Sequence, residues 1–346
     1  MLNKNKPFSL HLNPDLFLPA TAADKEYITQ MRPSTTFFKD GMKRLLRNKV
    51  ATVSMLIIVL VTIACIVLPS VWPYSYDQML GQTKGRPMDR SYNNLAPFEY
   101  GKTELSKIEK GESVFPHIFG TDSHGRDYFI RVVYGTRISL AVGFFASIIV
   151  LIIGLTIGSI AGYFGGKIDL FMERFSEILG AVPTMIVITL LKYHMGSSSQ
   201  ALVLFIAFFA TGWIGMAGRT RMQFYRFKNQ EYVLAARTLG ARDMRIMFKH
   251  IFPNGLGTIV TSVALVIPSM IYSETSLSYL GIINLEAGNT TSVGTLIAAG
   301  KASITANAGY VALFPCVFLV LLMLSFNLFG NGLRDAFNPS LRGTED

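Results

Sequence analysis

Charged residues are scarce in this chain and absent from long stretches of it. Asp, Glu, Lys and Arg make up 16% of the 346 residues, against about 25% in soluble globular proteins. Half of the residues are apolar, and the mean hydropathy is +0.38. The charges crowd between the apolar stretches. An ordinary soluble domain is therefore excluded, and the membrane span is the unit by which the chain divides.

The sequence also lacks the patterns on which most enzyme chemistry rests. The nearest approach to the phosphate-binding run G-x-x-x-x-G-K-[ST] is Gly166-Lys167, but Ile168 follows it and Ala161 stands where the first glycine belongs. The chain therefore has no ATPase site of its own. Its five histidines are scattered without the spacing of a metal site, and its two cysteines fall in apolar stretches. We predict no enzyme activity, cofactor or metal.

Six stretches are candidates for membrane-spanning helices, because a bilayer core needs about 20 apolar residues in a helix. Five contain no charged side chain: Val50 to Tyr76, Ile138 to Gly166, Tyr193 to Gly218, Ile251 to Ser273 and Ala302 to Leu333. The sixth, Ile168 to Leu191, carries Asp169, Glu173, Arg174 and Glu177 in its first half. We place these charges at the membrane surface or facing the protein interior. The alternative is a re-entrant or surface segment, which would leave five spans.

Lysine and arginine indicate the orientation. Nine of them lie in residues 1–49 and eight in residues 219–249, whereas the short connections on the other face hold only Lys192 and Lys301. Because the basic short segments of a membrane protein lie in the cytoplasm, we predict a multi-pass membrane protein with both termini cytoplasmic. The net charge of +10 is then a topology signal. We expect contact with membrane lipid and none with nucleic acid.

The predicted fold class is all-α, a polytopic membrane protein with about six transmembrane helices. We divide the chain into a cytoplasmic segment (1–49), a first span (50–71), an extracytoplasmic loop (72–135), a five-helix core (136–333) with a cytoplasmic loop (225–253), and a cytoplasmic tail (334–346). Glycines at four-residue spacing from Gly154 to Gly162 predict close helix packing. Glu274, near the outer end of the fifth span, either lies at the interface or pairs inside the bundle.

The cytoplasmic loop contains the most informative run, Glu231-Tyr-Val-Leu-Ala-Ala-Arg-Thr-Leu-Gly240. Its first part has helical periodicity, and Gly240 suits the left-handed turn at a helix C-terminus. Asp243 can cap a second helix, which we expect to run until Pro253. The result is a helix-turn-helix suited either to contact with another protein or to the lipid headgroups.

This loop resembles the EAA loop of bacterial ABC importer permeases, whose pattern is E-A-A, three residues, Gly, nine residues, Ile, any residue, Leu-Pro. Four residues stand at matching positions: Ala235, Ala236, Gly240 and Pro253. Leu234 replaces the glutamate of the pattern, and Glu231 lies one turn away. The resemblance implies a coupling helix seated in a cleft of a cytoplasmic ATPase. It gives that role to Glu231, Ala235, Ala236, Arg237, Gly240, Ala241 and Pro253.

The likeness extends from about Lys39 to Arg342. Five further runs follow, in order and spacing, the C-type permease of the oligopeptide, dipeptide and nickel importers: Gly120-Thr-Asp-Ser-His-Gly-Arg-Asp127, Tyr134-Gly-Thr-Arg-Ile-Ser-Leu140, Gly162-Tyr-Phe-Gly-Gly166, Glu274-x-x-Leu-Ser-Tyr-Leu-Gly281 and Asn327-Leu-Phe-Gly-Asn-Gly-Leu-Arg-Asp335. Departures from the pattern are Asn331 and Asn338 in place of aspartates, and Val293-Gly294 in place of Trp-Gly.

The resemblance implies the ABC type I importer permease fold, a place in the cytoplasmic membrane of a bacterium, and a set of partners. These are a second (B-type) permease subunit in a heterodimer, two cytoplasmic ATPase subunits that bind the ATP, and an extracytoplasmic peptide-binding protein. We therefore expect a peptide importer subunit that forms half of the translocation pore, with a nickel or metal-chelate importer as the alternative. Two other classes stay open: an ion-coupled secondary transporter, with Asp169, Glu173 and Glu177 as its ionisable groups, and a structural or channel-forming membrane protein.

Overall fold

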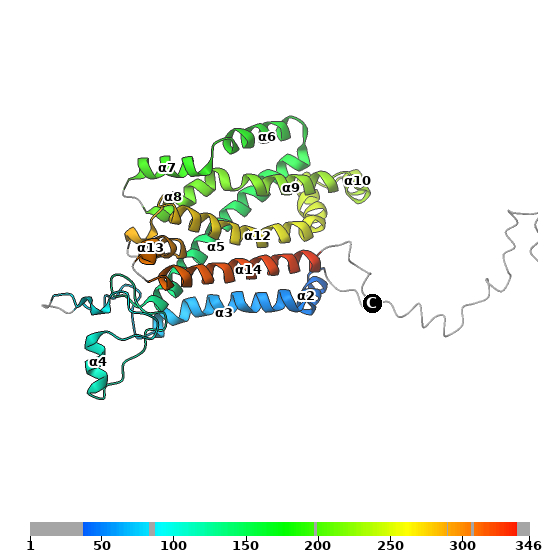
Figure 1. The fold of residues 1–346 in the computed structure, drawn as a ribbon. Coiled ribbons are helices and arrows are strands. Elements are labelled where there is room, and N and C mark those ends of the chain that lie inside the picture. The colour runs from blue at the N-terminus through cyan, green and yellow to red at the C-terminus, as the bar shows by residue number, and fades with distance from the viewer. Residues whose placement is uncertain (1–36, 83–86, 197–198, 289, 306–307, 338–346) are drawn as a thin grey trace, which may run out of the picture. The chain divides into compact units, whose positions relative to one another are not determined.

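The computed structural model describes residues 37–82, 87–196, 199–288, 290–305 and 308–337 (Figure 1). The chain divides into a unit of residues 1–40 and a larger unit of residues 41–346, and the architecture below is that of the larger unit. The boundary between the two units falls within helix α2 (Phe37–Arg47), so the larger unit begins with the rest of that helix. Regular structure in the described residues is helical, apart from one isolated β-bridge between Thr121 and Asp127. The predicted all-α fold class is confirmed.

Five helices or joined helices are long and apolar enough to cross a membrane. They are α3 (Lys49–Val71), α5 (Tyr128–Phe164), α8 (Gln200–Ala207) joined through η3 (Phe208–Gly212) to α9 (Ile214–Phe227), α11 (Asp243–Arg245) joined through η4 (Ile246–Ile251) to α12 (Phe252–Tyr279), and α14 (Tyr310–Phe337). Both η3 and η4 are π-helical turns. These five match the five uncharged stretches of the sequence.

The charged sixth stretch is a bent pair of helices. α6 (Gly166–Gly180) and α7 (Thr184–Met195) meet at an angle of 71°, so that the described residues contain five spans, or six if the pair is one span. Pro183 lies at the bend and directly precedes α7. Proline removes a backbone donor and disfavours a helical conformation in the residue before it, which accounts for the break. About six spans were expected, and the geometry agrees.

Hydropathy places the starts of four spans seven to ten residues from their observed positions, and the cause is plain for two of them. α5 begins at Tyr128 instead of near Ile138, because Arg131 and Arg137 interrupt the apolar run without interrupting the helix. The uncharged stretch from Ala302 includes the end of a separate short helix, α13 (Val293–Thr305), and α14 begins only at Tyr310. The intervening residues carry no charge, so composition alone does not separate the two helices.

The glycines of α5 let α9 approach closely, as their spacing predicts. A Cβ atom built on Gly158 would lie 2.3 Å from the carbonyl oxygen of Ala217, and one on Gly162 would lie 2.6 Å from that of Arg221. Any side chain at these positions would force the helices apart. Small residues at four-residue spacing are a common means of packing helix backbones in a membrane.

The connections gather at two ends of this unit. Figure 1 shows α4 (Lys102–Glu109) and α13 at one end, and α10 (Glu231–Thr238) at the other, where α2 and the C-terminal end of α14 also lie. At the α4 end, the segment between α3 and α5 also contains the short helix η2 (Arg90–Tyr92). The hydroxyl of Tyr310 on α14 donates to the carbonyl oxygens of Leu95 (2.7 Å) and Thr121 (2.8 Å). These bonds fix the segment against the helices.

Candidate functional site

Helix α10 ends in a turn that its own backbone defines. Gly240 has a φ of +78°, in the left-handed region. Its amide donates to the carbonyl of Arg237 (3.0 Å), and the amide of Ala241 donates to the carbonyl of Ala236 (3.0 Å). This is the hydrogen-bond pattern of a Schellman helix end, where glycine is favoured because it has no Cβ. The predicted break at Gly240 is confirmed.

An apolar cluster holds this turn to the membrane helices. Val233 of α10 and Ile246 of η4 are fully buried, and they belong to one cluster with Tyr163 of α5 and Phe224 of α9. Close-packed side chains transmit displacement because few voids exist between them to absorb it. A force on the turn therefore acts on α5, α9 and α12 together.

Two polar contacts tie the same loop to the end of α5. The hydroxyl of Tyr163 donates to Asp243 Oδ1 over 2.5 Å, and the guanidinium carbon of Arg237 lies 5.9 Å from the centre of the Tyr163 ring, within cation–π range. Tyr163 thus contacts both halves of the helix-turn-helix. The sequence run Gly162-Tyr-Phe-Gly-Gly166 contains this tyrosine, but nothing local to that run indicates its partner.

Two expectations about the second helix of the loop are wrong. Asp243 does not cap α11, since Arg242 occupies the N-cap position and makes no side-chain cap, while the Asp243 carboxylate is directed to Tyr163. The helix also does not end at Pro253. This proline lies at the start of α12, directly after the π-helical turn η4, in a helical span that runs from Asp243 to Tyr279.

The outer side of the turn is apolar and exposed. Leu239, at its tip, is 88% exposed, and Met244 and Phe248 are 64% and 60% exposed. Arg242 and Arg245 are exposed beside them. Large apolar side chains gathered at the end of a rigid element, with charges around them, mark a surface that another protein or a membrane covers.

The residues assigned to the coupling role lie around this turn. Five are exposed: Glu231, Ala235, Arg237, Gly240 and Pro253. Ala236 is buried and Ala241 is partly buried against the apolar cluster. Ala235 and Ala236 therefore point in different directions, one outward and one into the protein. The structure brings all of them onto one helix-turn-helix and the helix start that follows it, and their contact with an ATPase stays a prediction.

The charges of the bent pair form two groups of ion pairs, one with Arg221 of α9 and one at the surface. Arg221 on α9 makes a bidentate contact to Asp169 on α6 (2.6 and 2.8 Å) and contacts Glu173 at 3.1 Å. Tyr225 donates a further hydrogen bond to Asp169 (2.7 Å). Glu177 instead pairs with Arg174 at the surface. Of the two placements expected for these charges, the interior one is found for Asp169, which is buried, and the surface one for Arg174 and Glu177. The sequence held one signal that could have indicated the partner of Asp169, because Arg221 follows shortly after the uncharged stretch that ends at Gly218.

Glu274 lies inside the bundle, fully buried. Its carboxylate accepts hydrogen bonds from hydroxyls on three segments: Ser139 of α5 (2.9 Å), Thr275 (3.5 Å) and Ser278 (2.9 Å) of α12, and Ser292 before α13 (2.7 Å). Of the two placements considered for Glu274, the interior one is correct. Its partners are hydroxyls, which carry no charge to reveal them in a sequence.

Among the described residues, no group of three or more His, Cys, Asp and Glu side chains is placed to hold a metal ion. Cys65 is buried and Cys316 is partly buried, and neither forms a disulfide. The helix-turn-helix is held in place by packing and by hydrogen bonds.

Fold and site together define a class of protein: a multi-pass helical membrane protein that presents a rigid helix-turn-helix at one end of its bundle. Two family models match the chain. Residues 154–343 match the binding-protein-dependent transport system inner membrane component, and residues 36–97 match the N-terminal TM domain of oligopeptide transport permease C.

Similar proteins cover the chain almost end to end. The oligopeptide transport system permease protein OppC of Bacillus subtilis (strain 168) is 37% identical over 95% of this chain and 98% of its own length. The dipeptide transport system permease protein DppC of Lactococcus lactis subsp. cremoris (strain MG1363) is 35% identical over 97% and 99%. An inward-facing structure of the MetNI methionine ABC transporter aligns with 61% of this chain and 96% of its own, with a TM-score of 0.47 and 17% identity.

The chain belongs to the family of binding-protein-dependent transport permeases, inner membrane components of ABC transporters, in the OppC and DppC group. The resemblance read from its motifs is thereby confirmed. The chain is a multi-pass inner membrane component and not the ATPase. The secondary transporter and channel alternatives are excluded, which agrees with the binding of Asp169 and Glu173 by Arg221.

Proposed function

We propose that this chain is one of two permease subunits in an ATP-driven importer of short peptides. The observation that carries the proposal is the rigid, outward-facing turn at Leu239 and Gly240, in a chain whose relatives are oligopeptide and dipeptide permeases along nearly their whole length. Because the chain has no phosphate-binding loop, the energy of ATP must enter through a surface that another protein contacts. The exposed turn supplies that surface.

The proposed partners are a second (B-type) permease subunit, two cytoplasmic ATPase subunits and an extracytoplasmic peptide-binding protein. In this arrangement Leu239 and Gly240 enter a cleft of one ATPase, with Ala235 at its rim. Glu231 and Arg237 offer charged contacts beside it. The remaining residues shape the loop itself. Ala236 and Ala241 lie on its buried side, and Pro253 lies at the start of α12, which follows the loop. ATP is bound by the partner subunits.

Coupling follows from the rigidity of the loop. When ATP closes the ATPase pair, the docked turns move with it, and the apolar cluster around Val233 and Ile246 conveys the displacement to α5, α9 and α12. Those helices switch access to the pore between the two faces of the membrane. Such a mechanism needs a structural element with two arrangements, whose equilibrium is shifted both by the ATPase subunits and by the substrate in the pore. The loop connects the ATPase subunits to the helices of the pore.

We further propose that the α10 end faces the cytoplasm, so that both chain termini do so and α4 lies outside. The many lysines and arginines near α2 and α10 support this orientation. A single cysteine at Lys102 should react with a membrane-impermeant maleimide added from outside, and one at Arg242 should not. Both positions are exposed. Labelling of the Arg242 position in intact cells would reverse the orientation.

The substrate is tested in a strain that lacks this chain. Such a strain should lose growth on short peptides as the sole source of a required amino acid and regain it when the chain is restored. Nickel accumulation is measured in parallel. Undiminished peptide use with lost nickel uptake would replace the peptide assignment by the metal-chelate alternative and leave the importer assignment unchanged.

A further inference from the structure

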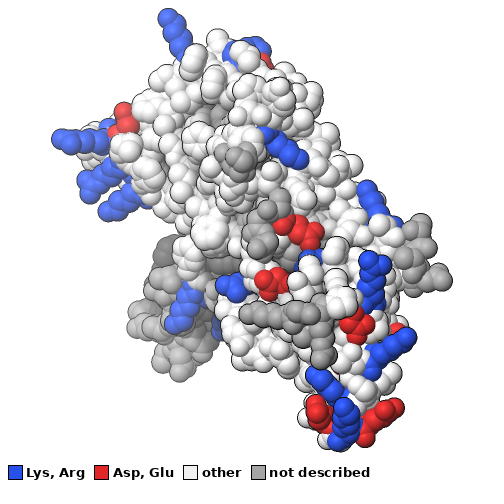
Figure 2. All heavy atoms as spheres, turned by 90° about the vertical axis from the view of Figure 1, so that its left-hand side faces the viewer, with Lys and Arg blue, Asp and Glu red and all other residues white. Residues whose placement is uncertain are grey.

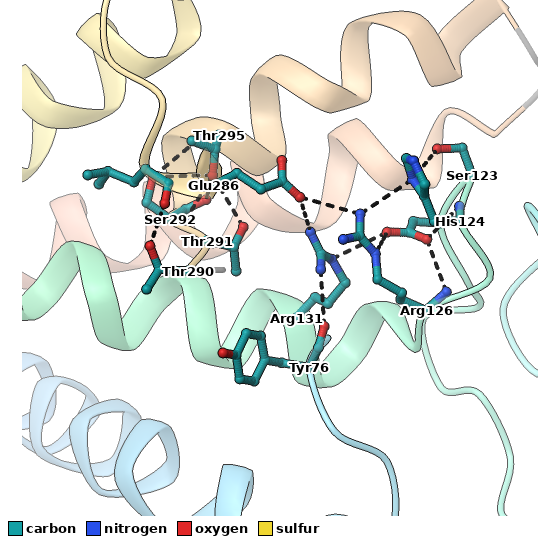
Figure 3. Close-up of polar contacts among 12 residues, drawn as sticks. Tyr76, Ser123, His124, Arg126, Arg131, Glu286, Thr290, Thr291, Ser292 and Thr295 are labelled. Carbon is teal, nitrogen blue, oxygen red and sulfur yellow. Dashed lines mark hydrogen bonds and ion pairs between the residues drawn. The ribbon is translucent and has the colours of Figure 1, made fainter. Parts of the chain in front are cut away.

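A charged cluster joins the start of α5 to η5 (Leu285–Gly288), and its polar contacts are drawn in Figure 3. Its centre is Arg131 in the first turns of α5, whose side chain is only 4% exposed. Its Nη1 donates to the carbonyl of Tyr76 (3.0 Å), its Nε lies 3.3 Å from Asp122 Oδ2, and its Nη2 lies 2.7 Å from Glu286 Oε1. Two of these partners precede α5 in the chain, whereas Glu286 comes from a distant segment.

A second arginine converges on the same carboxylates. Arg126 Nε lies 2.8 Å from Asp122 Oδ2 and its Nη2 lies 3.4 Å from Glu286 Oε1. Asp122 is buried, and its Oδ1 accepts the backbone amides of His124 (2.8 Å) and Arg126 (3.0 Å). The two guanidinium groups are therefore held in place by Asp122 and the loop backbone, without help from Glu286.

Glu286 is held far less firmly than Asp122. It lies on the single 3₁₀ turn η5 (Leu285–Gly288), and its side chain is 35% exposed, against 8% for Asp122. Within the described residues it reaches both arginines through Oε1 alone. Withdrawal of Glu286 would leave two guanidinium groups facing one carboxylate, and so one positive charge without a partner.

The cluster opens into a cavity of about 320 Å³. Met79, Ser123 and His124 line it on one side, and Ala299 and Ser303 of α13 on the other. Figure 2 looks onto this end of the molecule, where acidic and basic side chains lie close together at the surface. The cavity leaves room for a side chain that approaches the arginines from outside the chain.

We propose that Arg126 and Arg131 form a receptor for a carboxylate side chain of the extracytoplasmic substrate-binding protein, and that Glu286 occupies this receptor when that protein is absent. Arginine suits the role because its planar guanidinium binds carboxylates in a fixed geometry and keeps its charge at every physiological pH. The inference rests on the proposed function for the side of the membrane on which α4 lies and for the binding protein as a partner.

Charge complementarity points to an acidic partner. The receptor carries an excess positive charge once Glu286 leaves, and Glu286 itself demonstrates that a carboxylate fits between the two arginines. Exchange of an internal carboxylate for one from the docked protein lets docking move η5, and with it the start of α13. Docking is thereby linked to the position of helices that pack on α12 and α14.

The test measures the affinity of the purified binding protein for the reconstituted transporter. Arg126→Gln removes the more exposed arginine and should weaken docking by about tenfold or more, with a smaller dependence on salt. Glu286→Gln removes the internal competitor and should strengthen docking. Arg90→Gln, an exposed arginine on η2, is the matched control and should leave the affinity unchanged.

A charge exchange identifies the partner group. A photo-reactive side chain at Met79 should crosslink to the binding protein next to an acidic residue, and replacement of that residue by lysine should restore docking to the Arg126→Glu variant. Weakening by Glu286→Gln as large as that by Arg126→Gln would overturn the proposal, because the cluster would then be a structural tie alone. Equal affinity in all variants would overturn it too. The docking assay compares each variant with the wild type and does not depend on which substrate is carried. A wrong peptide assignment would therefore appear in the growth and uptake assays and would leave the docking result unchanged.

Discussion

His117 Nδ1 lies 2.8 Å from Asp127 Oδ2, with both side chains wholly buried. Nε2 of the same ring lies 3.2 Å from Glu104 Oε1 on α4. The imidazole therefore bridges α4 and the residue that caps α5, because Asp127 also accepts the amide of Ile130 (3.1 Å). One buried histidine holds the segment between α3 and α5 to the membrane helices.

This bridge should weaken at alkaline pH. Burial alone would lower the pKa of His117, but hydrogen bonds to Asp127 and Glu104 and the charges of these carboxylates outweigh it and raise the pKa from 6.5 to about 9. A folded-state pKa above the unfolded one means that the stabilisation is complete below pH 6.5 and is lost as the pH rises to about 9. Limited proteolysis of residues 87–127 should therefore accelerate across this interval.

The control is His117→Gln, which can still donate one hydrogen bond but has no charge to lose. Its proteolysis should be faster than that of the wild type at pH 6 and should change little up to about pH 9. Fluorescence of Trp72, which packs on Phe115 and Phe129, gives a second measure in a Trp213→Phe background. A wild-type profile that is flat over this interval would show that His117 is not charged in the folded protein.

Substitutions at Gly240 distinguish two reasons for a glycine at this position: the left-handed backbone of the turn and the limited space in the ATPase cleft. A Cβ here would meet no atom of this chain within 4 Å, so that the intrachain constraint is the left-handed backbone alone. Gly240→Asn tolerates that conformation better than Gly240→Ala. If the turn alone matters, Asn should preserve ATP-driven uptake better than Ala. If the ATPase cleft admits only a small residue, Asn and Leu should both abolish uptake while Ala reduces it, by about fivefold for roughly 1 kcal/mol of strain.

Uptake by reconstituted transporter, normalised to the amount of chain in the membrane, decides between these outcomes. Ala236→Asp is the companion variant, since it places a charge at a buried position of α10. It should lower uptake and loosen the ATPase subunits. Normal uptake in both Gly240→Leu and Ala236→Asp would remove the loop from the mechanism.

Tyr163→Phe tests whether the contact to Asp243 contributes to coupling. The variant keeps the aromatic ring beneath Arg237 and removes only the hydroxyl that donates to Asp243. ATP hydrolysis should continue while the amount of substrate moved per ATP falls, because the loop remains docked but is joined less firmly to α5. Tyr193→Phe, at an 83% exposed tyrosine, is the control. An unchanged ratio of transport to hydrolysis would limit Tyr163 to packing.

The sequence predicted the parts of this structure that depend on local chemistry. Lipid admits only long apolar helices, so the spans were visible in the hydropathy, and the turn at Gly240 was visible because only certain residues favour a left-handed backbone. The bend at Pro183 follows from one residue in the same way.

Pairs distant in sequence were not predictable. Tyr163 and Asp243 are separated by 80 positions, and Arg131 and Glu286 by 155. Sequence periodicity relates residues within one helix and does not reveal such distant pairs. Each member, taken alone, is also compatible with a place at the surface or at the membrane interface. Asp243 illustrates the result: it looked like a helix cap, a local role, and instead serves a long-range contact.

Glu274 organises the α13 end of the bundle through relayed hydrogen bonds. The amide of Val293 donates to Ser139 Oγ (3.1 Å), and the amide of Thr295 donates to Ser292 Oγ (3.2 Å). Both of these hydroxyls in turn donate to the Glu274 carboxylate. Amides at the start of α13, which lack helical partners, are thereby linked to the Glu274 carboxyl group at the positive end of the helix dipole.

Glu274→Ala should therefore release α13. It leaves buried hydroxyls without an acceptor, each at a cost of roughly 1–3 kcal/mol, and should lower the yield of folded protein sharply. Glu274→Gln retains the size and one acceptor oxygen, but its amide nitrogen cannot accept, so the serines on that side lose their partner. Its melting temperature should fall by several degrees, by less than in the alanine variant. A cysteine at Ser303, buried in the wild type, should become reactive to maleimide in both. Wild-type stability and protection in Glu274→Gln would mean that the carboxyl group is bound in its neutral form, since only a neutral group is matched so closely by an amide.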